Sequence, residues 1–158
     1  MMESSYTNLF YSHRKGTAAA SAIEIVPWVL EQTDAKSVVD IGCGTANWLS
    51  VFCEHGVSDV LGLDGPWVPT QELEIAPSKF RAVDFRNLDT LKLDRTFELV
   101  ICLEVAEHLP GSHAAEFIAR LVELGSCILF SAAAPGQGGI GHLNEQPPAY
   151  WVELFGRH

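Results

Sequence analysis

The chain has 158 residues, of which 47% are hydrophobic and 19% charged, a composition typical of one globular domain with a substantial core. Its formal net charge of −10 argues against the basic surface that sequence-independent binding of nucleic acid requires. No segment approaches the roughly 20 apolar residues of a membrane span, the start of the chain does not resemble a signal peptide, and the four cysteines form no CxxC pair. These features predict a cytoplasmic protein with reduced cysteines and no membrane association. They argue against extended binding of nucleic acid, and leave a nucleic-acid terminus or a small molecule open as the substrate.

Strand and helix patterns alternate along the chain. A first helix is predicted at residues 18–32, with Ile23, Val26 and Leu30 on its inner face and a kink or restart at Pro27. Apolar runs without alternation predict buried strands, and periodic apolar runs predict helices. The strands are expected at residues 37–41, 59–64, 79–84, 97–103 and 126–132. Three later helices are expected: one at residues 47–55, one that begins after an N-cap at Ser112, and one that begins after Pro147 and ends at Gly156.

This alternation is typical of an α/β fold. We expect a doubly wound parallel sheet of about five strands, in the order 3-2-1-4-5, with helices on both faces. Ligands of such sheets bind beyond the carboxyl ends of the strands, at the point where the strand order reverses. The residues that follow each strand are therefore the first place to look for a site.

The first strand ends in a glycine turn, Gly42-Cys43-Gly44. Glycines there indicate a backbone conformation that side chains disfavour, or a ligand that lies against the main chain. A dinucleotide fingerprint, G-x-G-x-x-G, requires a third glycine at position 47, where this chain has Asn47. The turn therefore suits a different adenosine-containing cofactor better than a dinucleotide.

Four acidic residues lie at four strand ends: Asp40, Asp64, Asp84 and Glu104. Unpaired buried carboxylates are costly, so four of them along one edge favour a role as acceptors for the hydroxyl and amino groups of a ligand. Asp64 follows Gly42 by 64 − 42 = 22 residues, close to the ~20 expected for an acid that binds ribose hydroxyls.

These motifs resemble those of the class I S-adenosylmethionine-dependent methyltransferases, a Rossmann-like family. The first motif is residues 40–46, with Ala46 in place of a third glycine; VLGLD, AVDF and FELVICLEVAEHL resemble the next three in order. The resemblance covers residues 10–155 and implies a single S-adenosylmethionine-binding domain over residues 1–158. Within it, residues 1–36 form an N-terminal lid segment and helix, and 37–158 form the core. The last two strands of the family's sheet, an antiparallel C-terminal hairpin, are expected to be absent.

The resemblance also implies a cofactor site. Gly42 and Gly44 let the backbone approach the methionine part, Asp40 orients its amino group, Asp64 accepts from both ribose hydroxyls, and Asp84 accepts from the adenine amino group. Phe85 and Trp67 either cover the adenine or belong to the core. The full expected set is Tyr11, Asp40, Gly42, Cys43, Gly44, Asp64, Gly65, Trp67, Asp84, Phe85 and Leu103.

Acceptor-side chemistry is expected at Glu104, Glu107 and His108, which share one face if Glu104 begins a helical turn, and at His142 in the loop after the fifth strand. His108 could act as a general base. Alternatively, all four residues could hold Mg²⁺ or Mn²⁺, a set that resembles the metal site of small-RNA 2′-O-methyltransferases and of quinone-pathway O-methyltransferases. The third interpretation is a solvated helix start whose acids favour the helix N-terminus.

The expected function is transfer of a methyl group from S-adenosylmethionine to an oxygen of a small-molecule or sugar-like acceptor. The alternative is a weak or inactive cofactor-binding fragment, or a subunit that needs a partner. The apolar fifth strand is expected at an edge of the sheet, where it favours pairing with a second copy of the chain.

Overall fold

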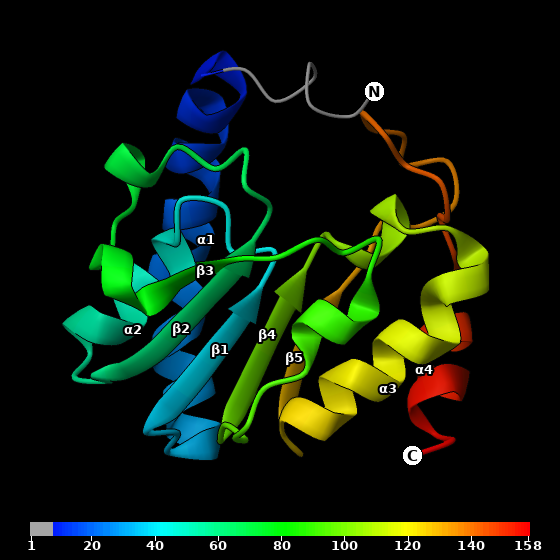
Figure 1. The fold of residues 1–158 in the computed structure, drawn as a ribbon. Coiled ribbons are helices and arrows are strands. Elements are labelled where there is room, and N and C mark those ends of the chain that lie inside the picture. The colour runs from blue at the N-terminus through cyan, green and yellow to red at the C-terminus, as the bar shows by residue number, and fades with distance from the viewer. Residues whose placement is uncertain (1–7) are drawn as a thin grey trace.

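A five-stranded parallel sheet organises the computed structural model, which describes residues 8–158, with side chains from residue 16 onward except that of Thr17. The strand order is β3-β2-β1-β4-β5, which confirms the predicted sheet (Figure 1). The strands are β1 (Ser37–Ile41), β2 (Asp59–Asp64), β3 (Phe80–Ala82), β4 (Leu99–Leu103) and β5 (Ile128–Ser131).

The two central strands are buried on both faces, because helices cover both sides of the sheet. β1 and β4 are apolar at nearly every position, and their register sets Asp40 between Gly62 of β2 and Ile101 of β4. Gly62 is needed at that register, since a Cβ there would lie 2.7 Å from the Cys43 sulfur. Close packing at this point brings the turn after β1 against β2.

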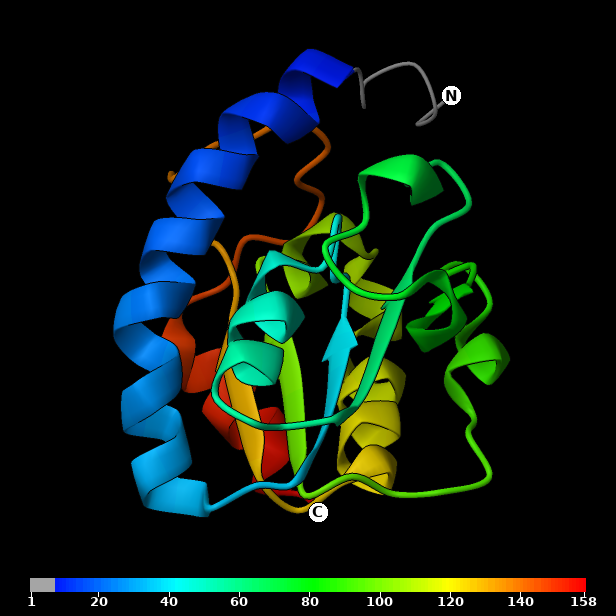
Figure 2. The same cartoon turned by 90° about the vertical axis from the view of Figure 1, so that its left-hand side faces the viewer.

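The helices divide between the two faces of the sheet (Figures 1 and 2). α1 (Asn8–Thr33) and α2 (Asn47–Glu54) contribute to a core that includes Val38, Leu49 and Ile101. α3 (Ala114–Leu124) and α4 (Pro148–Phe155) belong to a second core, with Val100 and Phe117. Two separate cores on one sheet are the defining feature of a doubly wound fold.

The first helix differs from its prediction in length and in its buried face. α1 begins at Asn8 and runs through Pro27 without a break. Ala22, Val26 and Val29 face the sheet, whereas Ile23 is 57% exposed, so the Ile23 end of the predicted apolar face is wrong. Ile23 is three positions from Val26, but it follows Ala22 by one residue, roughly 100° around the helix, which sets it beyond the edge of the buried face.

Element ends also differ. β3 stops at Ala82, so Asp84 lies two residues beyond the strand that was expected to contain it. The predicted cap at Ser112 is wrong: a 3₁₀ turn, Gly111–His113, precedes α3, and His113 occupies the cap position without a side-chain hydrogen bond. Short 3₁₀ turns at helix ends are common and shift the start of a helix by one turn.

Within residues 8–158, none of the helices combines the length and the apolar character that crossing a bilayer requires.

Candidate functional site

A tight backbone turn follows β1 and sits against the end of β2. Gly42 and Gly44 have φ values of 81° and 55°, in the left-handed region that glycine adopts without strain. The amides of Gly42 and Cys43 both donate to the carbonyl of Leu63, at 2.7 and 3.2 Å. Among the described residues, no atom lies within 4 Å of the position that a Cβ on Gly44 would occupy, so these residues leave that side of the turn open.

Ala46, at the position of the family's third glycine, is also left-handed, with φ 65° and ψ 34°. For a residue with a Cβ this conformation costs roughly 1–2 kcal/mol. Its side chain is fully buried in the core beneath α1 and α2, where packing offsets part of that cost. The turn therefore keeps the glycine-like backbone path although glycine is absent at this position.

The carboxylate of Asp64 connects the glycine turn to β2. One oxygen accepts from the amide of Gly44 at 2.7 Å, and the other accepts from the amide of Gly65 at 2.6 Å. Burial raises the pKa of Asp64 to about 6, against the lowering effect of these two amides. Asp64 thus lies where the sequence motif expected an acid, but in this structure it binds the backbone of the turn.

Asp40 is 4% exposed at the centre of the sheet. Burial, followed by the negative charge of Asp64, raises its pKa from 3.8 to about 8. Asp40 and Asp64 are acidic side chains that burial makes costly to ionise at the same time. They therefore favour a ligand that brings positive charge or hydrogen-bond donors to this edge.

The remaining expected cofactor residues fall into different environments. Trp67 packs over Gly65, whose added Cβ would meet the indole ring at 2.1 Å. Phe85 is half-buried against the core beneath α3 and α4, and Leu103 against the core beneath α1 and α2. Tyr11 lies within the span of α1, but its side chain is outside the described residues, and so is the start of the expected lid.

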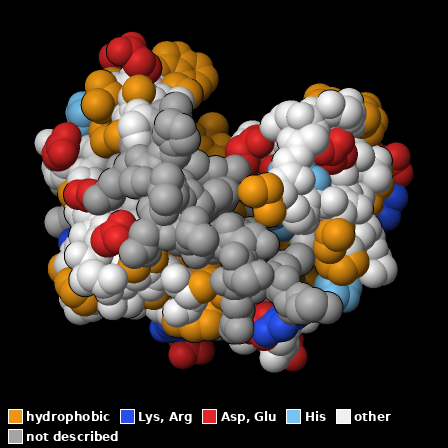
Figure 3. Space-filling model, turned by 90° about the horizontal axis from the view of Figure 1, so that it is seen from above, with side chains coloured by type: hydrophobic (Ala, Val, Ile, Leu, Met, Phe, Trp, Pro, Cys, Tyr) orange, Lys and Arg blue, Asp and Glu red, His pale blue; other side chains and the backbone are white. Residues whose placement is uncertain are grey.

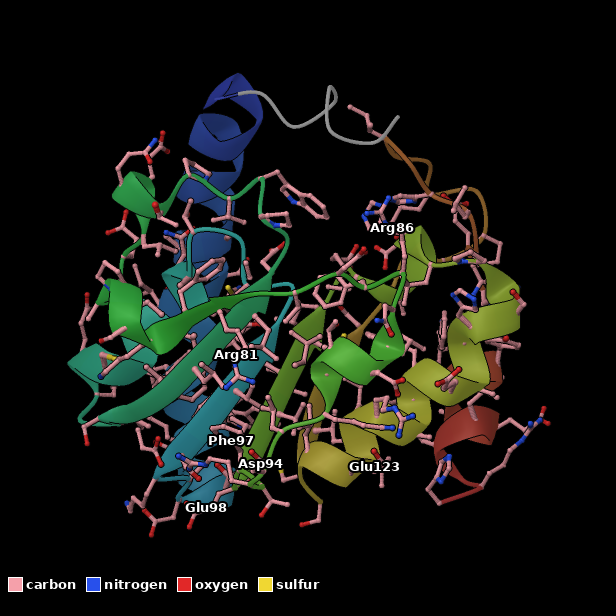
Figure 4. The ribbon with its side chains drawn as sticks, in the orientation of Figure 1. Arg81, Arg86, Asp94, Phe97, Glu98 and Glu123 are labelled. Atoms are coloured by element: carbon pink, nitrogen blue, oxygen red, sulfur yellow. The ribbon has the colours of Figure 1, made fainter. Side chains whose placement is uncertain are left out.

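Asp84 makes a bidentate ion pair with Arg86, through Nε at 2.8 Å and Nη2 at 2.9 Å. The hydrogen bonds from Arg86 lower the pKa of Asp84. Figure 4 shows Arg86 near the carboxyl ends of the strands, whereas Asp94 and Glu98 lie at the opposite end of the sheet. The acid expected to contact adenine is therefore engaged by a neighbouring arginine.

The acceptor-side residues do not share one helical face. Glu104 has φ 58°, unusual for a residue with a side chain, and a 3₁₀ turn, Ala106–His108, follows it. Its carboxylate accepts from the hydroxyl of Ser131 at 2.7 Å and from the side-chain amide nitrogen of Gln137 at 3.2 Å. The structure thus directs Glu104 toward β5 and the loop that follows it.

Glu107, His108 and His142 do come together, with one potential ligand atom from each within 4.8 Å of the others. The two imidazole rings are 4.9 Å apart and nearly perpendicular. Glu107 is fully buried, and neither carboxylate oxygen makes a hydrogen bond of normal geometry. Burial raises the pKa of Glu107, against the lowering effect of its own backbone amide and, less strongly, of the amide of Ala133.

A buried carboxylate whose oxygens lack well-formed hydrogen bonds, beside two imidazoles, forms a donor set that suits a divalent cation. The cation hypothesis expected four ligands, and three of the four residues meet; Glu104 is not in the cluster. Figure 3 views the molecule along the sheet from the carboxyl ends of the strands, and acidic and histidine side chains are visible on this face.

Sequence reasoning missed Glu145, which contacts His142, and Asn144, whose amide donates to the carbonyl of Glu107. The available signal was a histidine with a glutamate three residues later in a glycine-rich loop. Two grooves lie away from this cluster, one between α1 and α2 and the other between β5 and α4.

A family model described as a methyltransferase domain matches residues 11–151. The chain belongs to the methyltransferase-domain family. The class I methyltransferase assignment made from the motifs is thereby confirmed, and the strand order agrees with it.

Curated methyltransferases are similar to this chain in sequence, and solved methyltransferases are similar to it in structure. A ubiquinone biosynthesis O-methyltransferase of Pseudomonas fluorescens is 26% identical over 139 residues, which cover 83% of this chain and 55% of the relative. Magnesium protoporphyrin IX methyltransferase from Synechocystis PCC 6803, solved with bound SAH, has a TM-score of 0.67 at 18% identity and covers 89% of this chain and 71% of that one. DesVI of Streptomyces venezuelae has a TM-score of 0.66 at 23% identity, over 84% of this chain and 58% of that one.

These solved structures share the fold of this domain. The chain spans about half the length of the curated relatives it matches.

The buried Asp40 makes stability depend on pH. Its folded pKa of about 8 exceeds its ordinary value of 3.8, so the folded state holds the proton more tightly than the unfolded state. The resulting stabilisation is complete below about pH 4 and is lost as the pH rises through 8. We expect Asp40→Asn to raise the unfolding midpoint more at about pH 8.5 than at about pH 5, by several degrees, since one pKa unit corresponds to about 1.4 kcal/mol.

Calorimetric melting at the two pH values measures this difference. Asp94→Asn is the matched control, because Asp94 is exposed and lies at the far end of the sheet (Figure 4). A difference between Asp40→Asn and wild type that is the same at both pH values would contradict the assignment.

Proposed function

We propose that this domain transfers a methyl group from S-adenosylmethionine to an oxygen of a small-molecule or sugar-like acceptor. The observation that carries the proposal is the open glycine turn, held by Asp64, beside the buried Asp40. Family membership and relatives described as O-methyltransferases support the same reaction.

The cofactor would lie along the carboxyl edge of β1 and β2. Its ammonium would approach Asp40 and lower the cost of ionising that carboxyl, because an opposite charge favours the charged form. Its ribose hydroxyls would donate to Asp64, whose oxygens can accept further hydrogen bonds beside those from the backbone. The open side of Gly44 leaves room for the chain of the methionine part. Trp67 is the aromatic side chain on this edge that suits contact with the adenine.

Bound S-adenosylmethionine supplies an electrophilic methyl group, so the protein's contribution is to position the acceptor and remove its proton. His108 is our candidate for the general base, since an imidazole titrates near neutral pH. The carboxylate of Glu107, buried within 4.8 Å of a ring nitrogen of His108, would stabilise the imidazolium as it forms.

We propose that the same three residues, Glu107, His108 and His142, can also hold Mg²⁺ or Mn²⁺. The buried carboxylate of Glu107 fits a cation, because burial without well-formed hydrogen bonds is costly and a positive ion removes that cost. Two imidazoles with one carboxylate suit Mn²⁺ better than Mg²⁺. Such an ion would lower the pKa of an acceptor hydroxyl.

S-Adenosylmethionine, or its demethylated product, is expected to bind at least about tenfold more tightly than NAD, because Asn47 replaces a glycine of the dinucleotide fingerprint. Asp64→Ala is expected to weaken binding by about 1–3 kcal/mol, or roughly 5- to 150-fold, through lost charged hydrogen bonds. Isothermal titration calorimetry measures both.

Asp64→Asn keeps one acceptor oxygen for the turn, and Asp94→Asn controls for charge alone. Preferential binding of NAD, or unchanged affinity in Asp64→Ala, would overturn the cofactor assignment. Tritium from labelled cofactor in the product of a metabolite panel would then separate turnover from binding without turnover.

If the cation site exists, Mn²⁺ at about 100 times its Kd is expected to stabilise the fold by about 2.7 kcal/mol, or roughly 5–10 °C in Tm. His108→Ala removes a ligand and should abolish the shift, while His158→Ala, at an exposed position on the far side of α4, should retain it. Differential scanning calorimetry with and without Mn²⁺ measures the effect. If neither Mn²⁺ nor a chelator changes the activity or the melting temperature, the cation site is ruled out and His108 acts as a base alone.

Self-association through β5 is our proposal for a partner. β5 pairs with β4 and, among residues 8–158, with no other strand. Its residues are half-exposed, and an apolar groove of ≈ 560 Å³ is lined by β5 and α4. An apolar strand edge favours pairing with another chain.

Light scattering over a concentration series is expected to show a dimer. Val152→Lys places a charge beside the groove, at a position that is 70% exposed, and should shift the equilibrium to monomer. Ile23→Lys adds the same charge to another exposed apolar position, on α1, and should not. A wild-type protein that stays monomeric at high micromolar concentration would rule out this interface.

A further inference from the structure

The loop between β5 and α4 brings His142 to the carboxyl edge of the sheet, and one carboxylate of that loop bonds both to His142 and to the loop's backbone. Glu145 accepts three hydrogen bonds, each 2.8 Å long: from Nδ1 of His142, from the amide of Gly138 and from the amide of Gly136. The loop is the orange segment at the upper right of Figure 1. One side chain thus connects the histidine to the backbone of the loop that carries it.

The bond from His142 fixes which ring nitrogen carries the proton. A carboxylate only accepts hydrogen bonds, so Nδ1 of His142 must be the protonated nitrogen. In the neutral ring the lone pair is then on Nε2. The same three bonds, with that from His142 the largest contribution, lower the pKa of Glu145, which keeps it an ionised acceptor.

The backbone of the loop also sets the position of the ring. A Cβ added to Gly139 would lie 2.2 Å from Nε2 of His142, so the imidazole packs directly against this glycine. His108 contacts the same loop, with its Nδ1 3.3 Å from the carbonyl oxygen of Gly141. The loop therefore supports both imidazole rings of the cluster.

We propose that Glu145 is a positioning residue for the candidate acceptor site: it holds His142 in the Nδ1–H tautomer and keeps Nε2 available to the cluster with Glu107 and His108. The role of the cluster in this inference rests on the proposed function; the effect of Glu145 on the His142 tautomer does not. A carboxylate behind an imidazole is the arrangement that orients histidine ligands and raises their basicity. A glutamate that only tied the loop together would need the two glycine amides and not the bond to His142.

Long-range ¹H–¹⁵N NMR of the histidine rings reads the tautomer directly, at a pH at which the rings are neutral and without cofactor or cation. In the wild-type protein His142 is expected as the Nδ1–H tautomer alone. Glu145→Ala should give a mixture of tautomers, whereas Glu145→Gln retains a side-chain oxygen that accepts from Nδ1 and should keep the wild-type pattern. Glu153→Gln is the matched control, because Glu153 is a glutamate of α4 paired only with Arg157 in the described contacts.

Mn²⁺ titration is the second measurement. Glu145→Ala is expected to weaken Mn²⁺ binding by about 10–100-fold, and Glu145→Gln by less. Retention of a pure Nδ1–H tautomer in Glu145→Ala would overturn the proposal. If wild type binds no Mn²⁺ but the tautomer changes as expected, the cation part of the proposed function fails and the role of Glu145 stands.

Gly139→Ala tests the same geometry without touching Glu145, in case Glu145→Ala fails to fold. The added methyl group must displace the His142 ring, so the ¹⁵N shifts of His142 and the Mn²⁺ affinity should both change. Gly16→Ala adds a methyl group on α1 where no atom of the described residues lies within 4 Å, and it should change neither. Unaltered His142 shifts in Gly139→Ala would show that the ring is not held by the loop.

Discussion

The hydrogen bonds from the amides of Gly44 and Gly65 to the carboxylate of Asp64 join the turn after β1 to the end of β2. Because of them, the turn keeps its left-handed backbone and its open side next to Asp40. Charge-assisted bonds to backbone amides are among the stronger hydrogen bonds in proteins. The geometry of the cofactor edge depends on this one carboxylate, which is also the group that a ribose would contact.

Strain and unfavourable charge are concentrated at the same edge of the sheet. Ala46 and Glu104, two of the three described residues with a side chain and a positive φ, lie at the carboxyl ends of β1 and β4. Asp40 and Glu107 are buried acids whose pKa values are raised by burial. Such costs persist where the surrounding fold enforces them, and they are typical of sites that bind a ligand.

The acceptor side depends on contacts between segments far apart in the chain. The carbonyl of Glu107 accepts from the amides of Leu143 and Asn144, which docks the loop after β5 onto the 3₁₀ turn after β4. Glu145 and Gly139 then set the ring of His142 within that loop. The two halves of the site are thus built differently: the cofactor edge from a local turn, and the acceptor cluster from a long-range loop contact.

The sequence by itself determined where the strands lie approximately, the glycine turn and the positions of Asp40 and Asp64. These follow from local causes, namely apolar runs that must be buried and glycines that permit positive φ. One of the three interpretations of the acceptor side grouped Glu107 and His142 with Glu104 and His108, and the structure brings Glu107, His108 and His142 together.

Only the tertiary structure decided that Glu104 turns toward Ser131, that Asp84 pairs with Arg86, and that Glu145 holds His142. The direction of a side chain depends on the backbone angle at its own residue and on which neighbours the fold supplies. The spacing of residues along a chain expresses neither quantity. At Glu104, for example, the spacing suggested the start of a helical turn, but the residue is left-handed and a 3₁₀ turn follows it.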